Sequence, residues 1–127
     1  MQNKLALIAG GLLGLVFVVF GLNFFIGFLD TPSPAPDTPA AAFMGAIYST
    51  GFLTFVKVLE IVGGVLVAIP KTRNFGLLIL GPIVLNILVY NVLIAPGGWM
   101  QPPVILISVL SGFLLWTAKD KFAQLQN

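Results

Sequence analysis

A lysine and a glutamate stand inside an otherwise apolar stretch and are the residues of this sequence best suited to chemistry. Lys57 and Glu60 occur in the string FVKVLEIVGG, three positions apart. An α-helix places residues with this spacing on one face, where they can form an ion pair. Buried charges are costly unless they are paired, so we expect the two side chains to face other helices.

Four uncharged polar residues interrupt the neighbouring apolar runs. Asn86 and Tyr90 are four positions apart and share a helical face, whereas Asn91 lies about 140° from Asn86 around a helix. Asn23 interrupts the first apolar run. Amide and phenol groups can donate to a ligand's carbonyl oxygen, and amides also form hydrogen bonds between packed helices. A ligand pocket and a structural network therefore both remain open.

Several classes of site are excluded by composition. The sequence has no cysteine and no histidine, which removes disulfides, thiolate nucleophiles and the usual zinc, haem and iron–sulfur ligands. No nucleophile–base constellation or phosphate loop is visible, which argues against an enzyme acting alone. The six Lys and Arg residues are scattered and the net charge is only +2, so a nucleic-acid footprint is missing. A redox role would need a bound cofactor or a partner protein.

The elements that carry these residues are those of a membrane protein. The sequence is 58% hydrophobic and only 8% charged, far from the soluble norm. A span needs about 20 apolar residues. We predict one transmembrane domain over residues 1–127, an all-α up-down bundle of four helices at about 5–29, 50–69, 75–95 and 103–118. A secretory signal peptide is the competing interpretation of the first run, which is longer than a normal signal core.

The connections between these spans are predicted from proline and glycine. Residues 30–39 read DTPSPAPDTP, which favours a stiff outer loop. Residues 40–50 either extend the second span or form an interfacial or separate helix broken near Gly51. Gly81 and Pro82 interrupt the third span, where we expect a kink.

The basic residues predict the orientation. Five of them fall on one side of the four spans, and the two loops on the other side contain none. The positive-inside rule then places both termini and the middle loop in the cytoplasm, in the cell (inner) membrane. At about 1.5 Å per residue, Glu60 lies roughly 14 Å from the inner end of its span, near the midplane. The five basic residues are Lys4, Lys71, Arg73, Lys119 and Lys121.

The central part of the sequence resembles a known family. The string FVKVLEIVGGVLVAIP, followed by GPIVLNILVYNVLIAPGG, is similar to the DoxX-like family of small four-helix membrane proteins. The resemblance runs from about Gly21 to Gly98, and its most specific part is the block of Lys57, Glu60, Gly63 and Gly64. It implies a four-helix fold and, from some relatives, quinone-linked sulfur oxidation. This chain departs from several relatives by carrying Asn91 where they have histidine.

These observations lead to one principal functional hypothesis. We expect a binding subunit that holds an amphipathic molecule, a quinone or a lipid, in the outer half of the bundle. Lys57, Asn86 or Tyr90 would donate to its carbonyl oxygen, and Glu60 would orient Lys57. The alternatives are a proton-coupled carrier that uses Glu60 and a scaffold that anchors a soluble enzyme through the loop of Lys71 and Arg73 and the C-terminal tail. A homo-oligomer or a redox partner protein is compatible with all three. The predicted ligand-binding residues are Lys57, Glu60, Asn86, Tyr90, Asn23 and Asn91.

Overall fold

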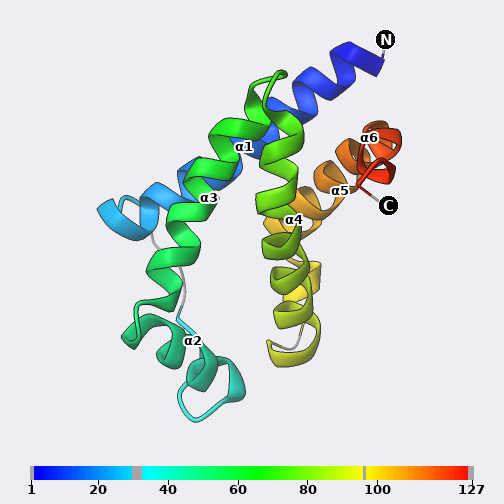
Figure 1. Cartoon of the computed structure of the whole chain (residues 1–127). Coiled ribbons are helices and arrows are strands. Elements are labelled where there is room, and N and C mark those ends of the chain that lie inside the picture. Colours follow the sequence, from blue (N-terminus) through cyan, green and yellow to red (C-terminus); the bar gives the residue numbers. More distant parts are fainter. Residues whose placement is uncertain (1, 30–32, 96, 126–127) are drawn as a thin grey trace.

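The computed structural model describes residues 2–29, 33–95 and 97–125, and all its regular elements are helical, with no strand in these ranges. The all-α prediction is therefore confirmed. The elements are α1 (Gln2–Ile26), α2 (Pro39–Ser49), α3 (Phe52–Ala68), α4 (Arg73–Val89), the π-helical turn η1 (Tyr90–Ile94), the 3-10 turn η2 (Gly98–Met100), α5 (Pro102–Thr117) and α6 (Lys119–Ala123) (Figure 1).

Two continuous helical segments are long and apolar enough to cross a membrane, Lys4–Ile26 and Arg73–Ile94. The pair α2 and α3 makes a third if it is one broken span. The apolar helix α5 has 16 residues and is therefore about 24 Å long, shorter than most spans. By length and composition the described residues thus provide two to three candidate spans, which supports a membrane protein.

Residues 39–69 form two helices rather than one. α2 and α3 are bent by 81° relative to each other, and the chain turns at Gly51, whose φ is +83°. A left-handed conformation favours glycine because it has no Cβ atom. At its other end α2 begins at Pro39, and the Thr38 hydroxyl accepts a hydrogen bond from Ala41 N at 3.2 Å. Of the predicted loop, residues 30–32 lie outside the described residues, and the rest reaches this cap without regular structure.

The helices α1 and α3 pack closely through glycines. A Cβ atom on Gly14 would meet the Gly64 carbonyl oxygen and lie 2.9 Å from Ala68 Cβ. On the reciprocal side, a Cβ atom on Gly64 would lie 2.9 Å from the Gly14 carbonyl oxygen. Such small residues let helix backbones approach without a hydrophobic driving force between them. The fully buried side chains of the surrounding core are Leu13, Val67, Leu80 and Leu114.

A tight turn joins α3 to α4. The Thr72 hydroxyl donates to Leu66 O at 2.8 Å, and Arg73 Nε donates to Val67 O at 3.2 Å. These bonds satisfy carbonyls at the end of α3 that lack helical partners. Beyond the turn, α4 continues as one helix through Pro82, where the sequence predicted a kink, and the helical pattern changes only at η1.

The elements divide between two ends of the molecule. In Figure 1 the N-terminus, the α3–α4 turn and α6 lie toward the upper end, whereas α2 and the connection from α4 to α5 lie toward the lower end. The five basic residues outside the spans belong to the upper elements. We call the lower end of the molecule the α2 end.

The glycine contact between α1 and α3 can be tested by adding a single methyl group. Gly14→Ala should lower the free energy of unfolding by about 1 to 3 kcal/mol, because overpacking forces the helices apart. The measurement is reversible unfolding in mixed detergent micelles. The control is Gly11→Ala, whose added methyl group meets nothing within 4 Å. That variant should be as stable as the parent or slightly more stable, since alanine favours helix. Equal losses in both variants would contradict the close packing.

Candidate ligand-binding site

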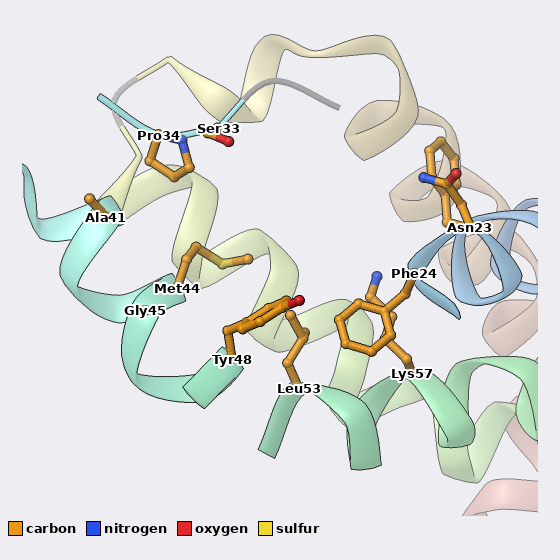
Figure 2. Close-up of a pocket in the computed structure, with 11 residues that line it drawn as sticks. Asn23, Phe24, Ser33, Pro34, Ala41, Met44, Gly45, Tyr48, Leu53 and Lys57 are labelled. Carbon is orange, nitrogen blue, oxygen red and sulfur yellow. The ribbon is translucent and has the colours of Figure 1, made fainter. Parts of the chain in front are cut away.

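A partly open cavity of about 630 Å³ lies at the α2 end of the molecule (Figure 2). Its volume is within the range of about 300 to 1,000 Å³ that is usual for small-molecule sites. Each of three helices contributes residues with the spacing of one helical face, and the loop before α2 completes the wall. The lining residues are Phe20, Asn23 and Phe24 of α1, Ser33 and Pro34 of the loop, Ala41, Met44, Gly45 and Tyr48 of α2, and Leu53 and Lys57 of α3.

The predicted ion pair is present on α3, where Lys57 forms part of the cavity wall. Lys57 Nζ lies 3.4 Å from Glu60 Oε1, and the side chains are 22% and 6% exposed. Lys57 lines the cavity, and Figure 2 shows its amino group directed into the open space beside Phe24. Glu60 belongs to the buried face of α3, together with Gly63, Gly64 and Val67. The lysine therefore stands between a buried carboxylate and the cavity.

Asn23 has a structural role as well as a place in the lining. Its Oδ1 atom accepts a hydrogen bond from Leu29 N at 2.6 Å, just beyond the end of α1, and the residue is 9% exposed. The chain leaves the helix at Gly27, whose φ is +74°. The bond to Leu29 uses the amide oxygen, so Nδ2 is the part of Asn23 that can donate to a ligand.

The apolar wall of the cavity was missed by the sequence reasoning. The rings of Phe24 and Tyr48 meet edge to face, with centroids 5.9 Å apart, and so connect α1 to α2. On α2 the lining residues are Ala41, Met44, Gly45 and Tyr48, at i, i+3, i+4 and i+7. This spacing marks one face of a helix and could have identified α2 as part of the site.

The remaining three predicted residues do not line the cavity. Asn86 is exposed on α4, and its Nδ2 donates to Pro82 O at 2.8 Å. Asn91 is 9% exposed and donates to Ile87 O at 2.7 Å, and its side chain fills the space beside Gly98. Tyr90 packs on Phe43 of α2 with ring centroids 5.2 Å apart. The structure thus places Asn23 and Lys57 in the lining, with Glu60 paired to Lys57 behind it, and the other three on α4 and η1.

The polar groups of the cavity are suited to a ligand that accepts hydrogen bonds. Lys57 offers an ammonium group with three donors, and the Asn23 amide and the Ser33 and Tyr48 hydroxyls can also donate. Among residues 33–95 and the other described parts of the chain, no aspartate or glutamate lines the cavity. The other lining side chains are aromatic or aliphatic. The cavity therefore combines several hydrogen-bond donors with largely apolar walls.

The ion pair should show strong energetic coupling. Glu60→Gln leaves a partly buried ammonium without its partner and should lower the free energy of unfolding by about 3 to 5 kcal/mol. Combining it with Lys57→Met should recover much of that loss, because neither charge is then left unpaired. A double-mutant cycle of unfolding in micelles measures the coupling. Strictly additive losses would show that the two side chains do not interact.

Comparisons of the chain with family models, with curated proteins and with solved structures found no match in any of the three.

Proposed function

We propose that this protein is a multi-pass inner-membrane protein that holds an amphipathic small molecule at the α2 end of a four-span bundle. The observation that carries the proposal is the cavity itself. It joins the amino group of Lys57 to walls built from Phe20, Phe24, Met44 and Leu53. A molecule with a polar head and an apolar body matches both parts of that lining.

The four-span topology rests on charge and length. The basic ends of the chain lie together in Figure 1, away from α2, and the positive-inside rule assigns such an end to the cytoplasm. In this arrangement α5 is the fourth span. Its 16 residues fall just short of the usual lower limit of about 17, and local thinning of the bilayer accommodates such a mismatch. The cavity then opens toward the outer side.

Binding fits the packing better than transport does. A proton-coupled carrier that uses Glu60 is the second candidate, favoured by the burial of a carboxylate within an apolar bundle. A path across the membrane also needs polar groups between Glu60 and the basic end. That part of the core is filled by Leu13, Val67 and Leu80, each at most 1% exposed.

The scaffold hypothesis has less support from the α3–α4 turn. Arg73 was one of its expected docking residues. Its guanidinium group instead donates to Val67 O and packs against Gly10 of α1. A side chain engaged in the fold in this way is poorly placed to recruit a soluble partner.

The resemblance to DoxX-like proteins bears on the ligand. We propose that the chain is a distant member of that family and that a quinone or a lipid occupies the cavity, with a redox partner in the first case. Lys57 would donate to the ligand's carbonyl oxygen, and Glu60 would hold the ammonium at the cavity edge. Asn23 would supply a second donor.

The topology can be mapped with single cysteines because the sequence has none of its own. Asn74→Cys and Gln124→Cys should react only after the membrane is opened, since both would face the cytoplasm. Asp37→Cys and Gln101→Cys should react with an impermeant maleimide on intact cells. Labelling of Asn74→Cys in intact cells would overturn the proposed orientation.

The ligand proposal can be tested by filling the cavity. Gly45 lines it, and a Cβ atom there meets nothing within 4 Å, so Gly45→Phe should occupy the space and leave the helix intact. Native mass spectrometry should find a co-purified amphiphile on the parent protein, and at least about tenfold less on this variant. Gly11→Phe adds the same side chain on α1, outside the lining, and should keep the ligand. Equal loads on the two variants would contradict the proposal.

A further inference from the structure

Lys57 lies between Glu60 and the cavity, and a group on either side can pair with its ammonium. Behind it lies the Glu60 carboxylate, with an N···O distance of 3.4 Å, and in front of it lies the cavity. That distance is long for a charge-assisted hydrogen bond, which is normally about 2.7 to 2.9 Å. One contact to Glu60 occupies at most one of the three ammonium donors. The lysine thus retains donors for a group inside the cavity.

The lining selects the chemical type of that group. The polar groups of Lys57, Asn23 Nδ2, Ser33 and Tyr48 can all donate, whereas no described lining residue offers a carboxylate to hold a cationic head. A carboxylate only accepts hydrogen bonds, and it complements the charge of Lys57. Zwitterionic heads would leave their ammonium group without a partner among these residues. The rest of the lining suits a hydrocarbon chain.

We propose that the cavity binds a long-chain monocarboxylate whose head replaces Glu60 as the partner of Lys57, and that Glu60 takes up a proton from solvent as this happens. The inference rests on the proposed function and names its ligand. In the free protein the pair is carboxylate and ammonium. In the complex the ligand carboxylate pairs with the same ammonium, and Glu60 becomes a neutral carboxylic acid. One proton is taken up for each ligand bound, and the only covalent bond that forms is the O–H bond of Glu60.

Burial of Glu60 explains why the proton is required. The side chain is 6% exposed, and a buried carboxylate that loses its ion-pair partner is strongly destabilised. Protonation removes the charge and leaves a group that can also donate a hydrogen bond. Lys57 is 22% exposed and reaches the cavity, where a ligand carboxylate can pair with its ammonium group.

The other ionisable groups on elements packed against α3 do not substitute for this pair. They are Lys4 of α1, Tyr48 of α2 and Arg73 of α4, with Tyr90 of the adjoining η1, and of these only Tyr48 lines the cavity. Arg73 is bound to Val67 O, seven residues along α3 from Glu60. Tyr90 packs on Phe43. Within the described residues, Lys57 is therefore the cation that both the Glu60 carboxylate and the ligand carboxylate can reach.

Binding of palmitate and of hexadecanol to the protein in nanodiscs tests this exchange, with empty nanodiscs as the control for partition into lipid. The two probes share a chain length and differ in the carboxylate. For the parent protein, palmitate affinity should rise about tenfold for each pH unit lowered over the range in which free palmitate and Glu60 are both ionised, as uptake of one proton requires. Hexadecanol affinity should not change with pH.

Two variants identify where the proton goes. Glu60→Gln should bind palmitate at least about tenfold more tightly at alkaline pH and lose the pH dependence, because Lys57 no longer has a competing partner. The double variant Lys57→Met with Glu60→Gln leaves no buried charge unpaired. It should lose the preference for palmitate and bind hexadecanol as the parent does, which also reports that it is folded.

The outcomes separate this inference from the proposed function. If neither probe binds the parent protein above the nanodisc background, the proposed amphiphile site itself fails. If both probes bind and palmitate shows no dependence on Lys57, the site stands and the carboxylate inference is wrong. If Glu60→Gln keeps the full pH dependence, the proton resides on the ligand and the exchange with Glu60 is overturned.

Discussion

The close contact between α1 and α3 at Gly14 and Gly64 is the constraint on which the other elements depend. Each glycine leaves room for the backbone carbonyl of the other, so the two helices meet without intervening side chains. This contact fixes which face of α3 is buried, and the same face carries Glu60 one turn away from Gly64. The depth and burial of the carboxylate therefore follow from the helix packing. Its need for a partner follows from its burial.

The cavity arises where this glycine packing ends. Toward the α2 end, α1 presents Phe20 and Phe24, and α3 begins just after Gly51, where the chain coming from α2 turns so that the two helices are bent by 81°. α2 crosses this end and is tied to α1 by the Phe24–Tyr48 contact and to η1 by the Phe43–Tyr90 contact. Because α2 is held by both aromatic contacts across this end of the molecule, it encloses a cavity there between itself, α1 and α3.

The sequence was most informative where a local rule decides the outcome. The apolar runs predicted helices, and the spacing of Lys57 and Glu60 predicted their contact, because both depend on the period of one helix. The grouping of Asn86, Tyr90 and Asn91 with Lys57 depended on depth alone. Depth follows from the rise per residue, whereas the direction of a side chain depends on packing between helices. The part of α2 in the cavity was missed for the same reason, since its neighbours are distant in sequence.

The polar residues of this apolar chain differ in what their donors already bind. Asn86, Asn91 and Ser108 each donate to the carbonyl four residues earlier, and these bonds satisfy them within their own helix or turn. Such local bonds are available to any amide or hydroxyl in a helix and need no ligand. An ammonium at the end of a long side chain has more donors than one neighbour can use. Lys57 meets that condition beside a cavity, whereas the side-chain donors of Asn86 and Asn91 are already bound within the chain, so Lys57 is the residue equipped to hold a ligand.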